Sequence, residues 1–528
     1  METHCYPITT LPHLSRLFTD FAQSETALQP FFHTSPSDPN WASHPVNFSG
    51  DRATLATLLE AQNQSWGAAP TTLENIARLR AGASVVVTGQ QVVLFGGPLF
   101  ALYKAATAIA RAQATGAVPI FWLATEDHDL DEANHIALAA PPDLQTLRLE
   151  ATAAPAQPVG SIPLGPGIQS VLDQAAEILG DVPELDLLRE TYQPSATFAE
   201  AFARLLLKLF ARQGLIVIDA SSRAFHAAGA GVLQAAIERA AELEPLLHQR
   251  DQLLAERGYH SQVLVAKNSS LLFLIDNETH ARQALKRDTT GNWTAGKSTY
   301  STADLLSILH AEPERLSPNA LLRPVFQDAI LPTLAYIGGP AEVAYFAQTQ
   351  VLYQAILGAT TPILPRLSAT IVEASLRNSM AKHGIELEDI LHHRPDDLTQ
   401  RLGARVMPVE GKQQLAATGN ALDRELTTLL NWMRSMDPGL GRSAETSASK
   451  MRYQMNRLRR MAANFQLQQD ESLRRHVEKL YAALYPKQHL QERAVAAISY
   501  LGKYGDALID AALAAAAELC PGHREIHL

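Results

Sequence analysis

The sequence of 528 residues predicts an α/β protein whose first half contains a parallel sheet. Two observations predict this fold. Residues 85–88 and 119–124 are short apolar runs, as found in strands that are buried on both faces. A helical segment, 98–113, lies between them, and strand, helix and strand in this order form the βαβ unit of a parallel sheet. Further strands are expected at 146–151, 214–219 and 331–337.

Residues 226–315 show a different pattern. A charged helix is predicted at 231–256, followed by two short strands, 261–266 and 270–275, that would pair antiparallel. This combination indicates a small insertion in the main domain.

The sheet signal ends near residue 411, where apolar residues begin to recur at helical spacings. Asp437 to Gly441 interrupts the pattern, so two long helices around a Pro-Gly turn are expected to form an antiparallel hairpin. Packing of the two helices against each other cannot bury the whole apolar stripe of so long a hairpin. Either the core or a second subunit must cover the rest, and we expect a homodimer. The apolar stripe consists of Leu415, Leu422, Leu426, Leu429, Met433, Met451, Met455, Leu458, Ala462, Phe465, Leu473, Val477, Leu480 and Leu484.

These patterns divide the chain into five segments. The core comprises 1–225 and 316–375, the insertion 226–315, the helical arm 376–487, and C-terminal helices that pack back on the core 488–528.

Composition limits the functions that the chain can have. Hydrophobic residues make up 46% and charged residues 19%, which is typical of a folded globular protein. The formal net charge of -10 argues against a broad nucleic-acid-binding surface, but a small anionic substrate needs only a few local cations. Because every long apolar stretch is interrupted by polar or charged residues, no membrane span is expected.

The two cysteines, Cys5 and Cys520, are too few for a four-thiolate zinc site or a disulfide framework. The first five residues lack the basic and apolar regions of a signal peptide. The prediction is a protein of the reducing cytoplasm that binds no zinc.

The first candidate site is the loop from Thr88 to Pro98, between the first strand and its crossover helix, where open α/β sheets bind ligands. Its glycines would let a ligand approach free N–H groups at the start of the helix. Two adjacent glutamines favour a binding loop over the alternative, a tight loop with glycine caps. The candidate residues are Thr88, Gly89, Gln90, Gln91, Gly96 and Gly97.

Carboxylates and two histidines crowd the segment from Thr125 to His135, directly after the second strand. An acid/base site needs a histidine of tunable pKa, and a magnesium-nucleotide site needs hard oxygen ligands. A helix N-terminus stabilised by acids is the alternative, but it explains neither the histidines nor the paired acids before the helix. The catalytic candidates are Glu126, Asp127, His128 and Asn134.

Residues 331–342 have the same pattern as the first loop: a strand, two glycines (Gly338-Gly339), a proline and a helix. An ordinary capped helix is the alternative. Arg323 and Arg366 flank this segment, and either could clamp a carboxylate or phosphate, or form only a surface ion pair. A basic cluster after the hairpin turn is expected to be a solvated face; it consists of Lys450, Arg452, Arg457, Arg459 and Arg460.

Together these segments resemble the bacillithiol-biosynthesis cysteine ligases, the BshC family. Val92-Val93 stands where the family has a pair like Ala-Gly. The resemblance rests on the motifs at 87–91, 95–98, 121–122, 126–129, 134–135, 323–327, 337–340, 365–368, 491–493 and 503–505, which occur in the family's order.

The resemblance implies a Rossmann-like core of the class I synthetase type, a connecting-peptide insertion and a coiled-coil arm used for dimerisation. It also implies a ligase that joins L-cysteine to glucosaminyl-malate in the last step of bacillithiol synthesis. Lys503 and Tyr504 become candidate binding residues through the same resemblance.

A free carboxylate must be activated before the sugar amine can attack it to form an amide. ATP with magnesium is expected to supply this activation. The 88–98 loop would contact phosphate or carboxylate, and His128 with Glu126 or Asp127 would orient substrate or act as acid and base. Asn134 and Gly338-Gly339 would complete the pocket. Two other classes stay open: a synthetase-related protein that binds RNA or nucleotides, and a non-catalytic dimeric assembly protein.

Overall fold

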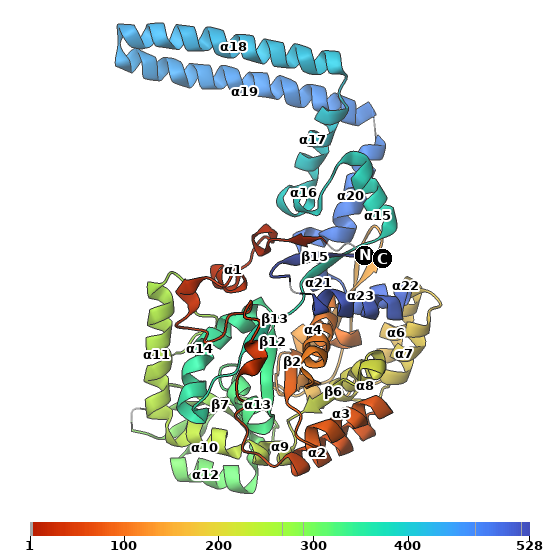
Figure 1. Cartoon of the computed structure of the whole chain (residues 1–528), viewed down its shortest axis with the longest axis vertical. Helices are drawn as coiled ribbons and strands as arrows, with labels where there is room; N and C mark the ends of the chain where they lie inside the picture. The colour runs from red at the N-terminus through yellow and green to blue at the C-terminus, as the bar shows by residue number, and fades with distance from the viewer. Residues whose placement is uncertain (1–3, 267, 289, 470, 519) are drawn as a thin grey trace. The chain divides into compact units, whose positions relative to one another are not determined.

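Five parallel strands form the central sheet in a computed structural model of the chain (Figure 1). In spatial order they are β13 (Ile363–Pro365), β12 (Thr333–Gly338), β2 (Val85–Gln91), β3 (Val118–Ala124) and β6 (Ile216–Asp219). Counted along the chain, this is the order 5-4-1-2-3 of a Rossmann-like sheet, and the order reverses between the first and the fourth strand. The predicted α/β fold with a parallel sheet is confirmed.

The structure describes residues 4–266, 268–288, 290–469, 471–518 and 520–528. Residues 1–3, part of the segment that argued against a signal peptide, lie outside them. The chain forms two compact units. The first unit extends to Val372 and includes Leu490–Leu528, and the second unit is Glu373–His489.

Helix α4 (Leu99–Thr115) makes the crossover between β2 and β3, and most of its residues are buried. It packs against both strands and also against α23 (Asp506–Ala517), which explains why most of its residues are apolar. Helices α2 (Arg52–Ser65) and α3 (Pro70–Arg80) pack on β6, and α14 (Pro340–Leu357) packs on β12 and β13. The first unit also contains α1 (Arg16–Ala22), α5 (Leu130–Ala133), α6 (Ile168–Leu179), α7 (Pro183–Thr191), α8 (Phe198–Leu209), α13 (Arg323–Ile330), α21 (Gln491–Ala494) and α22 (Ala497–Tyr504).

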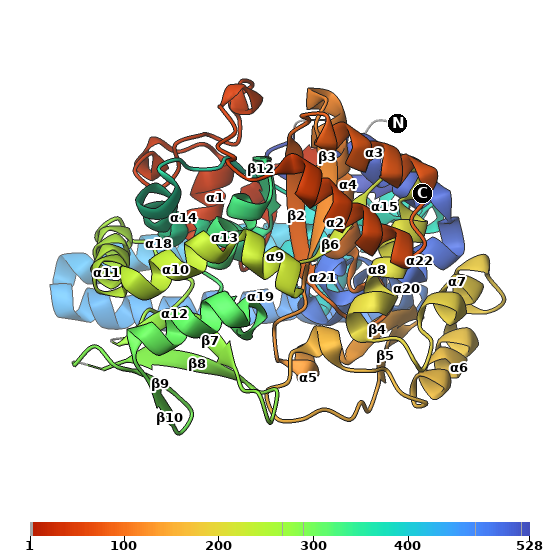
Figure 2. The ribbon, with the colours of Figure 1, turned by 90° about the horizontal axis from the view of Figure 1, so that it is seen from below.

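Between β6 and β12 the chain inserts helices and an antiparallel sheet, shown beside α10 and α12 in Figure 2. The sheet order is β10-β9-β8-β7-β11. The elements are α9 (Arg223–Ala228), α10 (Ala230–Glu238), α11 (Ala240–Glu256), β7 (Ser269–Ile275), β8 (Arg282–Arg287), β9 (Trp293–Ala295), β10 (Ser298–Tyr300), α12 (Thr302–Ala311) and β11 (Leu316–Pro318).

One strand prediction was wrong, and another strand has different bounds and partners from those of the central sheet. Residues 261–266 form no strand, because the backbone of Val263 bonds to the Gln348 side chain through both its N–H and its carbonyl, at 2.9 and 2.8 Å. β7 pairs instead with β8 and β11. The strand expected at 146–151 is β5 (Asp143–Arg148), which forms a separate hairpin with β4 (His135–Ala140) and does not join the central sheet.

The two ends of the described chain meet in a small sheet, β1 (Cys5–Tyr6), β15 (His523–His527) and β14 (Ala369–Val372). β1 and β15 run antiparallel, which brings the Cα atoms of Cys5 and Cys520 to 6.2 Å in a disulfide. The sequence analysis excluded only a framework of several disulfides and did not predict this single one. The sequence carries no local sign of this pairing, because the two residues are 515 positions apart.

The second unit is helical, and its longest helices form the predicted antiparallel hairpin, α18 (Val409–Met436) with α19 (Pro438–Gln469) (Figure 1). Leu426, Leu430 and Ala448 make a small core between them. The other helices are α15 (Ala374–His383), α16 (Leu387–His392), α17 (Pro395–Val406) and α20 (Glu471–Leu484).

A large apolar surface remains exposed on this hairpin. Its side chains are between 48% and 60% exposed, which is unusual for residues of this size. The surface, called here the exposed hairpin face, consists of Leu429, Trp432, Met436, Met451, Tyr453, Leu458, Met461 and Phe465.

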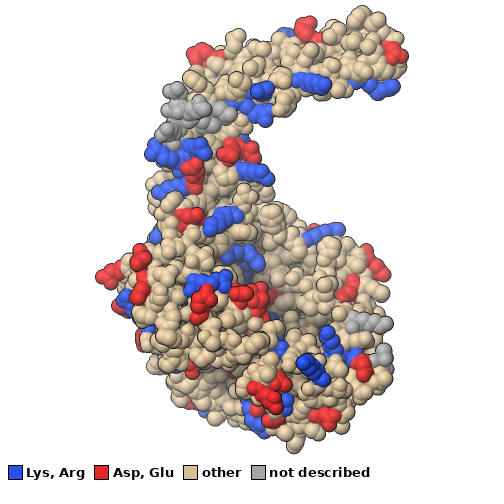
Figure 3. Space-filling model, turned by 180° about the vertical axis from the view of Figure 1, so that it is seen from behind, with Lys and Arg blue, Asp and Glu red and all other residues tan. Residues whose placement is uncertain are grey.

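Charges of both signs are interspersed on the face drawn in Figure 3. Within the basic cluster of α19, Arg452 pairs with Asp423 at 2.9 Å and with Glu445 at 3.5 Å. A helix of the length and apolarity that a membrane span requires does not occur in the described part of the chain.

Candidate functional site

A cavity of about 460 Å³, called here the central cavity, lies at the carboxyl ends of β2, β3 and β12. It opens where the strand order reverses, between β2 and β12, the position at which open α/β sheets bind ligands. Gly89, Gln90 and Gln91 line it from the end of β2, and Gly339 lines it from the turn after β12.

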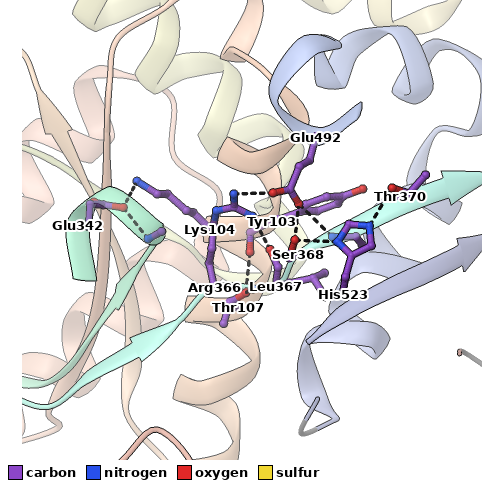
Figure 4. Close-up of polar contacts among 12 residues, drawn as sticks. Tyr103, Lys104, Thr107, Glu342, Arg366, Leu367, Ser368, Thr370, Glu492 and His523 are labelled. Carbon is purple, nitrogen blue, oxygen red and sulfur yellow. Dashed lines mark hydrogen bonds and ion pairs between the residues drawn. The ribbon is translucent and has the colours of Figure 1, made fainter. Parts of the chain in front are cut away.

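An ion pair between Lys104 and Glu342 forms one wall of the central cavity (Figure 4). Lys104 comes from α4 and is only 4% exposed; its Nζ lies 2.6 Å from a Glu342 oxygen. The ammonium also donates to the Gly89 carbonyl at 2.6 Å and to the Gln90 side-chain oxygen at 3.0 Å. Burial lowers the pKa of Lys104, and the Glu342 carboxylate opposes that shift. Lys104 therefore fixes the end of β2 against the start of α14.

Glu342 explains the Gly-Gly-Pro segment after β12. Its carboxylate accepts the Gly339 N–H at 2.8 Å and the Tyr336 hydroxyl at 2.5 Å, so it caps the N-terminus of its own helix. Burial would raise the pKa of Glu342, but Lys104 and these hydrogen bonds outweigh burial and lower it. A carboxylate of the chain thus already occupies the helix end that was expected to receive an external anion.

The central cavity holds more cations than carboxylates. Arg323 donates to the Tyr345 hydroxyl at 3.0 Å, and Arg493 lies over the Phe100 ring at 5.8 Å. The cations of the lining are Lys104, Arg323, Arg366 and Arg493, against the carboxylates Asp127, Glu132 and Glu342.

Arg366 is held by a buried carboxylate that does not line the cavity. Its guanidinium lies 2.7 Å from Glu492, and the two side chains are 4% and 2% exposed. Glu492 also accepts from the Ser368 hydroxyl at 3.1 Å and from the Ala369 N–H at 3.0 Å. His523 contacts the hydroxyls of Ser368 and Thr370 (Figure 4), each at 2.8 Å. Burial lowers the pKa of His523 to about 4, so this imidazole stays neutral beside the ion pair.

A second cavity of about 350 Å³, called here the side cavity, adjoins the central one and shares Trp122, Asp127 and Arg323 with it. Asp127 accepts from the Gln91 side chain at 2.6 Å and from the His128 N–H at 2.7 Å. Burial would raise the pKa of Asp127, but these hydrogen bonds outweigh it, so the pKa is lowered.

Two further charged groups shape the side cavity. The Arg282 guanidinium stacks 3.7 Å from the Phe273 ring centre. Glu126 lies 3.0 Å from Nε2 of His226, a completely buried imidazole. Burial disfavours the charged form of His226, but Glu126 outweighs this effect and raises the pKa. The side cavity therefore places ionised groups of both signs beside the central cavity.

The structure brings nine of the predicted site residues to the two cavities. Seven line the central cavity: Gly89, Gln90, Gln91, Asp127, Arg323, Gly339 and Arg366. Glu126 and His128 line the side cavity.

Other predicted residues lie elsewhere. The Gly96 N–H donates to the Tyr192 hydroxyl at 3.1 Å, and the Gly97 N–H donates to the Leu94 carbonyl at 3.0 Å. Tyr192, directly after α7, thus pairs with one of the N–H groups of this turn. The anion site expected at the start of α4 remains a prediction without support from the geometry. Thr88 is buried and donates to the Ile337 carbonyl, and Gly338 packs against Ile363.

Three more of the predicted residues have structural contacts. Asn134 accepts from Arg148 at 3.1 Å and is not part of either lining. Tyr504 packs against the hydrophobic core, and the Lys503 ammonium lies 5.9 Å from the Tyr500 ring centre. The roles expected for these residues remain predictions without support from the geometry.

The sequence reasoning missed several residues of the cavities. Lys104 carried a signal, because it is a single lysine within an apolar helix, and such a residue needs a buried partner. Glu342 stands at the third position of its helix, where capping acids are common. No such signal marked Tyr336, Tyr345 or Arg282, nor His226, which lines neither cavity but contacts Glu126.

Among the described residues, no three His, Cys, Asp or Glu side chains are grouped so that they could hold a metal ion. The carboxylates of the central cavity that do not pair with lysine are Asp127 and Glu132.

Comparison with known proteins identifies the family. The family model described as "Bacillithiol biosynthesis BshC, N-terminal Rossmann-like domain" matches residues 1–367, and "Bacillithiol biosynthesis BshC, C-terminal coiled-coil domain" matches 369–528. Proteins named "Putative cysteine ligase BshC" are similar over their length. The one from Koribacter versatilis is 41% identical over 100% of both chains, and the one from Solibacter usitatus is 35% identical over 96% of each. The chain therefore belongs to the BshC family of bacillithiol biosynthesis, as its motifs predicted.

Proposed function

We propose that this chain is a ligase that joins L-cysteine to glucosaminyl-malate through an amide bond, with ATP and magnesium as co-substrates. The names of its relatives support a cysteine ligase. The observation that carries the proposal is a group of four cations that lines the central cavity at the ligand-binding edge of the sheet; among the described residues, no carboxylate forms an ion pair with two of them, Arg323 and Arg493.

The chemistry explains why such a site is suitable. ATP would convert the cysteine carboxylate to an acyl phosphate or an adenylate. The sugar amine would then attack the carbonyl carbon, and phosphate or AMP would leave. The negative charge on phosphate and carboxylate oxygens grows or shifts in both steps. Fixed guanidinium and ammonium groups stabilise that charge without having to reorganise.

The residues divide between two tasks. Arg323, Arg366 and Arg493 would bind phosphate or carboxylate oxygens, and Asp127 with Glu132 offers the oxygen ligands that magnesium prefers. The amine must lose a proton as it attacks. His128 and the carboxylate of Glu126 lie at the adjoining side cavity, where they would take up that proton.

Incubation of the purified chain with L-cysteine, glucosaminyl-malate, magnesium and ATP tests this function. We expect the thiol product together with either AMP and pyrophosphate or ADP and phosphate, and the pair that forms identifies the activated intermediate. Low-molecular-weight thiol profiles of cells with and without the protein test it in vivo. Unchanged profiles, together with no product in vitro, would contradict the proposal.

His128→Ala is expected to abolish product formation without unfolding the chain. The side chain of His128 is 39% exposed and its loss removes little packing, so the free energy of unfolding should change by less than about 0.5 kcal/mol. His135→Ala is the matched control, because His135 belongs to the same segment but lines neither cavity. Steady-state rates and thermal melts check both variants. Activity in the His128 variant equal to that of the control would remove the assigned role.

We also propose a homodimer in which two copies cover the exposed hairpin face. Met451→Glu with Met461→Glu should give a monomer, since two charges would then need to be buried in the interface. Ser443→Glu, at an exposed polar position on the same helix, should leave the dimer intact. Light scattering measures the mass of each variant. A wild-type monomer at micromolar concentration would contradict the proposal.

A further inference from the structure

A third cavity, of about 130 Å³, is called here the arginine cavity. Arg111, near the end of α4, lines it together with Arg524 from β15 and Arg366. Trp41 forms part of another wall. Arg366 is the only charged residue that the linings of the arginine cavity and the central cavity share.

The positive charges of this cavity are not all compensated. Arg524 pairs with Glu518 at 2.6 Å, and Arg366 pairs with Glu492 at 2.7 Å. Among the described residues, no carboxylate and no hydrogen-bond acceptor contacts the Arg111 guanidinium. Burial lowers the pKa of Arg111, and the positive charge of Arg524 lowers it further. A partly buried guanidinium beside a second one is costly unless an anion accompanies it.

The wall of the cavity is held in place covalently. Cys520, Pro521 and Gly522 line it, and the disulfide from Cys520 to Cys5 fixes this segment to β1. The next residues pair along β15, where the Arg524 N–H donates to the Ser368 carbonyl at 2.9 Å. Arg524 itself is 4% exposed, so its position is set by packing.

The cavity has room for a small anion. A volume of 130 Å³ is roughly that of four water molecules at ~30 Å³ each. That is enough for phosphate, sulfate or a small carboxylate. Guanidinium groups form paired, charge-assisted hydrogen bonds with oxyanions of this kind.

We propose that the arginine cavity is a binding site for a small oxyanion, a phosphate or a carboxylate, held by Arg111 together with Arg524. The proposal does not rest on the proposed ligase reaction, although Arg366 lines both this cavity and the central cavity. It requires only the residues of the first unit and the surplus charge of Arg111.

The NMR resonances of two tryptophans can report anion binding separately at the arginine cavity and at the central cavity. The chain has five tryptophans; Trp41 lines the arginine cavity and Trp122 lines the central cavity. In protein labelled with fluorotryptophan, the Trp41 resonance, assigned with Trp41→Phe, reports on the arginine cavity. The Trp122 resonance reports on the central cavity in the same spectrum.

Titration with sodium phosphate should shift the Trp41 resonance to a plateau. Arg111→Met should weaken that response by about tenfold or more, as expected when a charge-assisted pair is lost. Arg189→Met, which removes a charge from an exposed pair elsewhere in the unit, should not change it. Arg323→Met should alter only the Trp122 response. Parallel titrations with sulfate and acetate decide whether the site prefers a tetrahedral or a planar anion.

Several results would overturn the proposal. One is a Trp41 resonance that none of the three anions shifts. Another is a shift that grows linearly with salt and is equal in the Arg111 and Arg189 variants. A response of Trp122 alone would place the anion in the central cavity only. Arg111→Lys keeps the charge and serves as the folding control, since it should retain part of the response that Arg111→Met loses.

Discussion

Lys104→Met is expected to destabilise the chain by about 3–5 kcal/mol and to abolish activity. The variant leaves the Glu342 carboxylate buried without its cation, and breaking a buried pair from one side costs that much because the remaining charge is uncompensated. It also frees the Gly89 carbonyl and the Gln90 side chain at the end of β2, so the lining of the central cavity loses its fixed geometry.

A second substitution separates stability from function. In Lys104→Met combined with Glu342→Gln, no charge remains buried at this position, so a large part of the lost stability should return. Activity should not return, because the central cavity then lacks the ammonium group. Denaturant unfolding and steady-state rates of the two single variants and the double variant give the coupling energy.

Lys208→Met is the matched control, since Lys208 and Glu190 form a lysine–glutamate pair at 2.8 Å whose side chains are 36% and 62% exposed. Exposed pairs contribute at most about 1 kcal/mol, so this variant should be close to wild type in both measurements. If Lys104→Met were no less stable than the control, the buried pair would not have the role assigned to it.

The strands of the central sheet could be predicted because their signal is local. Val85 to Val87 and the run 119–124 are apolar because both faces of the sheet are covered, and that pattern is visible without knowing what covers them. The hairpin helices were predicted for the same reason, since their apolar spacing and the Pro-Gly turn are local features.

Predictions failed where a distant residue decides the local structure. The run around Val263 has strand composition, but Gln348 of α14 takes both of its backbone hydrogen bonds. The glycine loop before α4 has the composition of an anion site, but the hydroxyl of Tyr192, directly after α7, already accepts the Gly96 N–H. The disulfide is the same kind of case. No property of these segments alone indicates the partner.

The candidate site was predicted in part for a related reason. Residues at the carboxyl ends of strands meet at one edge of a parallel sheet, so Gln90, Gln91 and Asp127 were correctly placed near one another. Lys104 projects into the central cavity from a helix behind the sheet. Its role depends on Glu342, which approaches only when β12 pairs with β2.

The last prediction concerns Glu492, which we expect to act on substrate binding only through Arg366. Glu492→Gln should raise the KM for the anionic substrates more than it lowers kcat, because the Arg366 guanidinium loses the carboxylate that orients it. Arg366→Met should have a larger effect and also destabilise the chain by about 3–5 kcal/mol, since it leaves Glu492 buried and unpaired by its cation.

The variant that combines Glu492→Gln with Arg366→Met shows whether Glu492 only positions Arg366 or has a function of its own. If Glu492 works through Arg366, adding Glu492→Gln to Arg366→Met should leave the remaining activity unchanged while it restores part of the lost stability. Glu525→Gln is the matched control: Glu525 is a buried carboxylate on β15 that accepts the Tyr6 hydroxyl at 2.8 Å and does not contact Arg366. Kinetic constants and unfolding free energies of the four variants check the prediction. A further loss of activity in the double variant would show that Glu492 has a function of its own, and an equal rise in KM for the Glu525 variant would show that the effect is structural.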